Sequence, residues 1–122
     1  MNVTVAESLL MKILWETSPR PSEELVAELG PSQNWSETTI RTLLARLVRK
    51  GAVAAEPDGR RFLYRPLIAE ADYLHAESQS LIQRLFGGQV GPFVAQFCQR
   101  ETLTAEDVAQ LKRLIQEYED GQ

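Results

Sequence analysis

The chain has 122 residues, of which 43% are hydrophobic and 25% are charged, which is typical of a globular protein with one domain or a small domain plus an appendage. It has no apolar run of 18 residues, no signal-peptide layout at its N-terminus and one cysteine, which together predict a cytoplasmic protein without membrane insertion. The net charge of −4 argues against a nucleic-acid binder unless the basic residues are concentrated in one segment.

Two helices are expected in the first part of the chain. Thr4 and Glu7 have the spacing of a capping box, and apolar residues then recur at helical intervals. This helix should end near Ser18-Pro19, because a proline disfavours helix in the residue before it. A second, short helix should begin at Pro21-Ser22 and end at Gly30-Pro31.

The third predicted helix has the clearest signal in the chain. Ser36 is a good N-cap, Trp35 can pack on Ile40 as a hydrophobic staple, and Gly51 suits a C-terminal stop. Its apolar residues follow the spacing of a buried helical stripe, and they are Ile40, Leu43, Leu44, Leu47 and Val48. The sequence therefore predicts a helix with one apolar face and a separate polar face.

A β-hairpin should follow this helix. Residues 52–56 and 60–65 are the predicted strands, and Pro57-Asp58-Gly59 between them is a tight-turn signal. Phe62 and Tyr64 alternate with polar residues, which predicts one buried face. The order helix, helix, helix, hairpin is that of a winged-helix domain, in which the third helix enters the major groove of DNA.

The chain changes character after Leu67. Residues 70–86 predict a helix that Gly87-Gly88 breaks, residues 90–99 are a short apolar stretch, and Thr104 begins a last helix with capping-box spacing. These helices are too few to enclose a core, so their apolar stripes should pack against a partner chain. The residues expected at this dimer interface are Leu74, Leu81, Leu85, Phe93, Phe97, Leu111 and Leu114.

The predicted fold class is mainly α with a small β-hairpin. A winged helix-turn-helix DNA-binding domain is expected at residues 1–69 and a helical dimerisation domain at residues 70–122. The charge distribution supports this division, since residues 38–65 carry seven basic and two acidic residues, whereas residues 67–122 carry four basic and nine acidic ones. A local basic patch matters more for phosphate binding than the net charge does.

The polar face of the third helix and the hairpin carry the expected DNA contacts. Arginine can bond bidentately to guanine, threonine can contact thymine, and no acid follows Glu37 on this face. Two arginines after the hairpin turn can reach phosphates or the minor groove. The predicted DNA-binding residues are Thr38, Thr39, Arg41, Thr42, Arg46, Arg49, Arg60 and Arg61. A solvated helix face and a charge-protected hairpin edge are the alternatives.

Two other classes of function stay open on the sequence. A winged-helix protein–protein interaction module would carry apolar or mixed-charge residues on the third helix. A Cys–His hydrolase built on Cys98 and His75 lacks an identifiable orienting group, and Cys98 beside Phe97 suits packing as a small hydrophobe. Neither metal-ligand spacing nor a Gly-rich phosphate loop is present, so no enzyme, cofactor or metal site is predicted.

Several motifs resemble the penicillinase-repressor (BlaI/MecI-like) family of winged-helix regulators. They are Leu14-Trp15, residues 35–47, Lys50-Gly51, residues 62–67, residues 85–88 and residues 103–107. The resemblance covers nearly the whole chain. It implies a homodimeric repressor on a dyad-symmetric operator in double-stranded DNA, with the C-terminal helices interleaved between subunits, controlling genes of the β-lactam-resistance type.

The resemblance also implies a route for release from DNA. In some family members a membrane metalloprotease sensor acts indirectly and leads to cleavage of the repressor between an asparagine and a phenylalanine in the dimerisation segment. The matching bond here is Gln96-Phe97, with glutamine in the place of asparagine. Copper-responsive relatives carry paired cysteines near the C-terminus, whereas this chain has Cys98 alone.

Overall fold

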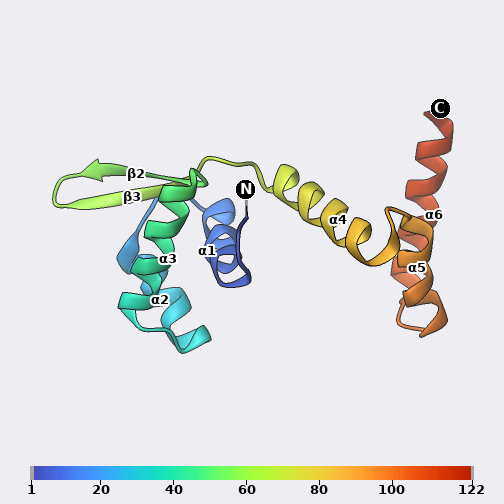
Figure 1. The fold of residues 1–122 in the computed structure, drawn as a ribbon, viewed down its shortest axis with the longest axis horizontal. Coiled ribbons are helices and arrows are strands. Elements are labelled where there is room, and N and C mark those ends of the chain that lie inside the picture. Colours follow the sequence, from blue (N-terminus) through green and yellow to red (C-terminus); the bar gives the residue numbers. More distant parts are fainter. Residues whose placement is uncertain (1, 122) are drawn as a thin grey trace. The chain divides into compact units, whose positions relative to one another are not determined.

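The computed structural model describes residues 2–121, which divide into two compact units, one reaching to His75 and the other beginning at Ala76. The elements, labelled in Figure 1, are α1 (Val5–Glu16), β1 (Arg20–Pro21), α2 (Ser22–Gln33), α3 (Glu37–Lys50), β2 (Val53–Asp58), β3 (Arg61–Pro66), α4 (Glu70–Phe86), α5 (Val90–Gln99) and α6 (Ala105–Asp120). The fold class predicted from the sequence, mainly α with a small β-hairpin, is confirmed, and a third strand joins the hairpin in an antiparallel sheet.

The ends of α1 and α3 lie where their capping residues predict. The Thr4 hydroxyl accepts a hydrogen bond from the Glu7 backbone N–H, and the Glu7 carboxylate accepts one from the Thr4 N–H, which completes the capping box. The Ser36 hydroxyl accepts from the Thr39 N–H at 3.1 Å, and α3 ends at Gly51 with φ of 82°. Local hydrogen bonding therefore fixes both helices that frame the first unit.

The predicted end of α2 at Gly30-Pro31 is wrong, because the helix continues to Gln33. Asn34 adopts the left-handed conformation that ends it, with φ of 57°, a conformation that asparagine tolerates better than most residues. The Gly30 carbonyl accepts hydrogen bonds from the N–H groups of Asn34 and Trp35. The last turn of α2 is thus closed by this cap, and the proline inside it is tolerated.

The sheet has three antiparallel strands in the order β1-β3-β2. Strand β1, which the sequence did not predict, pairs with the middle of β3. The predicted turn at Pro57-Asp58-Gly59 is also wrong, because Asp58 pairs with Arg61 and leaves only Gly59 and Arg60 in the loop. Gly59 has the positive φ, 65°, that two-residue hairpin turns require.

The hairpin buries only its base. Val53, Ala55 and Tyr64 face the helices, but Phe62 near the tip is 51% exposed, so the prediction of a continuous buried face holds for half of the hairpin. Figure 1 shows β2 and β3 extending away from the three helices. The tip is therefore free to meet a second molecule.

The core of the first unit lies between α1, α2, α3 and the base of the hairpin. Its buried hydrophobic residues are Val3, Leu10, Met11, Leu14, Leu25, Leu29, Ile40, Leu43, Leu44, Leu47, Ala52 and Val53. Val48, predicted as part of the apolar stripe of α3, is 38% exposed because it lies at the margin of that stripe. The remaining four stripe residues anchor α3 to the core.

The first residues of α4 pack on the first unit. The rings of Tyr73 and Trp15 have centroids 5.3 Å apart, and the Trp15 indole N–H donates to the Ile68 carbonyl at 2.9 Å. The prediction placed the domain boundary between residues 69 and 70, whereas the compact units meet within α4. The turn before α4 is thus held to α1 by an aromatic contact and a hydrogen bond.

The second unit comprises the rest of α4 with α5 and α6. Gly87 and Gly88 end α4 with φ of 59° and 85°, as the sequence predicts. The apolar stretch at residues 90–99 is itself a helix, α5, and Thr104 and Asp107 form the predicted capping box of α6. None of the described residues of this unit is buried, and no helix within residues 2–121 is long and apolar enough to cross a bilayer.

Candidate nucleic-acid interface

The polar face of α3 is presented to solvent. The four buried stripe residues hold the helix from one side, and the residues on the other side are exposed, namely Thr38, Thr39, Arg41, Thr42, Ala45, Arg46 and Arg49. The helix is thus held from one side, and its opposite face carries arginines, threonines and a small alanine. Such a face can enter a major groove and contact base edges. The structure thus places all six predicted α3 contacts on an accessible surface.

Arg41 has a carboxylate partner on its own helix. Its Nη2 lies 2.6 Å from Glu37 Oε1, one turn earlier, and both side chains are about three-fifths exposed, at 61% and 59%. Exposed pairs of this kind contribute little to stability. The pair therefore extends Arg41 along the helix without preventing the guanidinium from exchanging the carboxylate for a base edge.

Thr39 is engaged in the helix cap. Its hydroxyl lies 3.0 Å from the Ser36 hydroxyl, and its N–H donates to the same oxygen. The structure thus gives Thr39 a local partner, whereas Thr38 and Thr42 lie on the accessible face. A direct base contact suits Thr38 and Thr42 better than Thr39.

The two arginines of the hairpin differ in their surroundings. Arg60 lies in the two-residue loop and forms no ion pair with the residues that the structure describes. Arg61 Nε lies 3.2 Å from Asp58 Oδ2, and its Nη1 lies 3.3 Å from Glu23 Oε1 in the first turn of α2. The hydrogen bonds to Asp58 and Glu23 raise the pKa of Arg61 above its usual value. Arg61 thus ties the hairpin to α2, while Arg60 is free at the tip.

Ion pairs reduce the number of unpaired basic side chains in the segment 38–65. Four of the seven basic residues between positions 38 and 65 have acidic partners, and the pairs are Arg41–Glu37, Lys50–Glu7, Arg61–Glu23 with Asp58, and Arg65–Glu56. Arg46, Arg49 and Arg60 have no ion pair within the described part of the chain. Three of the acidic partners lie outside the counted segment, which is why the charge count missed them.

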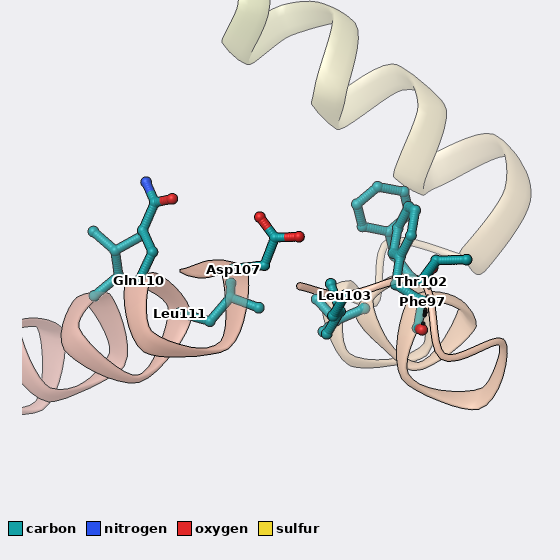
Figure 2. Close-up of a pocket in the computed structure, with 9 residues that line it drawn as sticks. Phe97, Thr102, Leu103, Asp107, Gln110 and Leu111 are labelled. Carbon is teal, nitrogen blue, oxygen red and sulfur yellow. Dashed lines mark hydrogen bonds between the residues drawn. The ribbon is translucent and has the colours of Figure 1, made fainter. Parts of the chain in front are cut away.

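Part of the predicted dimer interface lines an apolar groove between α5 and α6. Phe93, Phe97, Leu111 and Leu114 line this groove of about 600 Å³, and Figure 2 shows Phe97, Leu103 and Leu111 around it with Asp107 and Gln110 nearby. The rings of Phe86, Phe93 and Phe97 form an edge-to-face series, with centroids 5.6 and 5.4 Å apart. The other three predicted interface residues, Leu74, Leu81 and Leu85, lie on α4 outside the groove.

The bond matched to the family's cleavage site lies within a helix. Gln96 and Phe97 are both exposed, but the bond is in the second half of α5 and not between helices, as the sequence had suggested. The Phe97 carbonyl accepts hydrogen bonds from the Thr102 N–H at 3.1 Å and from its hydroxyl at 3.2 Å. Proteolysis at this bond would require α5 to open locally.

The residues considered for enzyme chemistry lie on different helices and in different units. Cys98 is exposed, so its predicted packing as a small hydrophobe is wrong, because α5 turns Phe93 and Phe97 toward the groove instead. His75 ends the first unit and Cys98 belongs to the second. Within residues 2–121, no group of three His, Cys, Asp or Glu side chains is placed to hold a metal ion.

Comparison with known proteins gives matches along nearly the whole chain. The family model described as penicillinase repressor matches residues 3–117. A penicillinase repressor of Bacillus licheniformis is 33% identical over 118 residues, which cover 97% of this chain and 92% of the relative. The methicillin resistance regulatory protein MecI of Staphylococcus aureus is 27% identical over 113 residues, covering 93% and 92%.

Two solved structures are similar to part of the chain at 40% identity. The solution structure of the DNA-binding domain of the repressor BlaI has a TM-score of 0.55 and covers 59% of this chain and 88% of its own. The monomeric form of Bacillus licheniformis BlaI, solved in complex with the blaP half-operator, has a TM-score of 0.54 and covers 60% and 89%. At this identity the likeness extends to the sequence of the matched domain as well as its fold.

Proposed function

This chain belongs to the penicillinase repressor family, and from that premise we propose that it is a sequence-specific transcriptional repressor acting as a homodimer on a dyad-symmetric operator. The observation that carries the proposal is the face of α3, which is exposed and has no acid after Glu37. A solvated helix in a chain of net charge −4 would be expected to carry acids there. A protein-docking face would carry apolar or mixed-charge residues.

In this proposal α3 is the recognition helix. Arg41 lies in its first half, where helix-turn-helix proteins contact base edges, so Arg41 reads a base together with Thr38 or Thr42. Arg46, Arg49 and Arg60 are without acidic partners in the described chain and bind phosphates. Arg61 keeps the hairpin in place beside α2 and contributes charge to the same surface.

The homodimer is supported by the second unit. Its large apolar side chains are open to solvent in the single chain, including Leu85 at 60%, Leu114 at 49% and Ile115 at 57% exposure. Apolar surface on this scale in a small unit marks an interaction site. Two winged units joined through this interface bind two half-sites with a high effective concentration of the second for the first.

The names of the relatives guide the choice of target and signal. The relatives are named penicillinase repressor and methicillin resistance regulatory protein, so genes of the β-lactam-resistance type are the first targets to examine. The protein is proposed to act on them in the cytoplasm. A membrane metalloprotease sensor acting indirectly through Gln96-Phe97 is the first signal to examine. The local structure of α5 bears on that signal, because the bond lies within this helix.

Selection of bound DNA from a random double-stranded library tests the proposal. We expect enrichment of an inverted repeat whose half-sites are about 10 base pairs, or a multiple of that, apart from centre to centre. A matched selection with Arg41→Ala should lose preference at one position in each half-site and keep the repeat. Recovery of unenriched sequences at physiological salt, where binding that depends on phosphates alone is weak, would contradict sequence-specific binding.

A further inference from the structure

Glu7 has a second role beside its place in the capping box. Its side chain has 0% exposure, and among residues 2–121 it is the one charged side chain that is buried. Burial of a carboxylate is costly unless it is paired and hydrogen-bonded. The capping box explains one hydrogen bond to this carboxylate, but not why a charged group is placed in the core.

Lys50, the last residue of α3, supplies the partner. Glu7 Oε1 accepts hydrogen bonds from the Thr4 N–H at 2.9 Å and from Lys50 Nζ at 2.5 Å. The same Nζ donates to the Asn2 carbonyl at 2.6 Å. One carboxylate and one ammonium group thus join the segment before α1, the first turn of α1 and the end of α3.

The Glu7–Lys50 pair is charged on both sides. Burial alone raises the pKa of Glu7, but the hydrogen bonds from Lys50 and Thr4 and the charge of Lys50 bring that pKa below its usual value. The second oxygen, Oε2, is buried without a hydrogen-bond partner in the described structure. A well-packed apolar pair is often as stable as a buried ion pair or more so, which leaves the directional hydrogen bonds as the distinctive property of this one.

We propose that Glu7 and Lys50 are positioning residues that fix the rotation and the C-terminal end of α3 against α1, so that the face bearing Arg41 and Thr42 meets base edges in register. The proposal rests on α3 being the recognition helix. Lys50 is held by Glu7 and Asn2 and does not contact DNA, although it follows Arg49 directly. Neither residue acts on the operator except through the placement of α3.

The test compares operator and random DNA binding by Glu7→Gln and the wild-type protein. The variant keeps the shape and an acceptor for the Thr4 N–H but removes the charge that holds Lys50. In full-length protein verified as folded by circular dichroism, we expect the ratio of random-DNA Kd to operator Kd to fall about tenfold for each half-site, as for the loss of one base contact. Random-DNA affinity should stay within about twofold, because phosphate contacts do not depend on register. A folded variant with the wild-type ratio would overturn the proposal.

Matched variants separate positioning from folding and from direct contact. Glu28→Gln removes an acid that pairs with Arg20 on the surface, and it should leave the ratio unchanged. If Glu7→Gln fails to fold, the apolar pair Glu7→Leu with Lys50→Met tests the same point, and retention of the wild-type ratio would again overturn the proposal. Lys50→Met alone should not change the slope of log affinity against log salt, whereas a phosphate contact would lower that slope by about one. A wild-type protein without operator preference would contradict the proposed function instead.

Discussion

The two units of this chain use similar amphipathic helices to different ends. In the unit that reaches to His75, the apolar stripes of α1, α2 and α3 close on one another and on the base of the hairpin, and twelve of the described hydrophobic residues are buried. From Ala76 onward none of the described residues is buried, and Leu85, Val90, Ile115 and Tyr118 are more than half exposed. Helical periodicity therefore identifies an apolar face but not what covers that face.

The difference assigns each unit a separate part of the function. The first unit contains its own core and carries the proposed recognition face, so it needs no second chain to present Arg41. The second unit has an apolar groove and exposed leucines that a partner would cover. Covering them would favour association by about 25 cal/mol for each square ångström of apolar surface removed from water. A change confined to the second unit should therefore affect dimerisation and leave the folding of the first unit intact, and a change in the core of the first unit should do the reverse.

Ending the chain after His75 should have the largest effect. The remaining unit should be folded and monomeric, with operator affinity reduced by about 10²- to 10⁴-fold because the two half-sites are then bound independently. Sedimentation and DNA titration measure the two quantities. A chain ending after Ala69 is the control for the boundary, since it also loses the contact of Tyr73 with Trp15 and should melt at a lower temperature. A chain ending after His75 that still sediments as a dimer would contradict this division of roles.

The destabilisation caused by a leucine substitution should depend on protein concentration in the second unit but not in the first. Leu44→Ala removes a side chain that is 1% exposed and should cost about 2–5 kcal/mol of unfolding free energy at any protein concentration. Leu114→Ala removes a side chain that is 49% exposed in the single chain, so its cost should appear in dimer dissociation. Thermal melts over a 100-fold range of concentration distinguish the two. Identical behaviour of both variants would contradict the comparison.

Much of the first unit was predictable because its signals are local. The caps of α1 and α3 and the stripe that ends at Leu47 each depend on residues within a few positions of one another, as does the break at Gly87-Gly88 in the second unit. Strand β1 could not be found in the same way, since two residues acquire strand geometry only by pairing with β3. The hairpin loop moved by one residue for a related reason: the cross-strand register, set by packing, selected Gly59 and Arg60.

The candidate DNA-binding face was predictable from residue type, but its electrostatics were not. Periodicity alone places Arg41 and Thr42 opposite the leucines. The carboxylates that hold Lys50 and Arg61 come from positions 43 and 38 residues earlier in the chain, and no window of sequence brings them together. Long-range partners of this kind engage Lys50 and Arg61, whereas nearby acids engage two other arginines. Three of the seven cations are left without an ion pair in the described residues.

Arginine substitutions on α3 should change base preference or salt dependence, and the size of these effects should scale with the number of recognition helices. Arg41→Ala should cost about 1–3 kcal/mol per half-site and relax preference at one base position. Arg46→Ala should weaken all sequences alike and lower the salt slope by about one per half-site. In the dimer each loss counts twice, and in the chain that ends after His75 it counts once. An Arg41→Ala protein with unchanged operator preference in a competition assay would show that Arg41 does not read a base.

The smallest change is expected at the bond matched to the family's cleavage site. We expect the full-length protein to stay intact in cells exposed to a β-lactam, for two physical reasons. The Gln96-Phe97 bond lies within α5, where its own Gln96 carbonyl accepts a hydrogen bond from the Arg100 N–H at 3.3 Å. The next carbonyl, that of Phe97, accepts two from Thr102, so a protease must first open the helix end. Glutamine also adds a methylene relative to asparagine, a difference that typically changes discrimination by about 1–3 kcal/mol.

An immunoblot of the wild-type protein beside Gln96→Asn and Thr102→Ala variants separates these two barriers. If side-chain size dominates, Gln96→Asn alone should yield a fragment that ends at residue 96. If the helix dominates, the loss of the Thr102 hydroxyl, which bonds the Phe97 carbonyl at 3.2 Å, should promote cutting instead. Rapid loss of the wild-type band, with a fragment ending at Gln96, would show that neither barrier protects the bond. That result would also show that cleavage in the second unit controls DNA binding by the first. Cutting α5 separates α6 from the rest of the groove, so the dimer is weakened and each winged unit can leave its half-site independently.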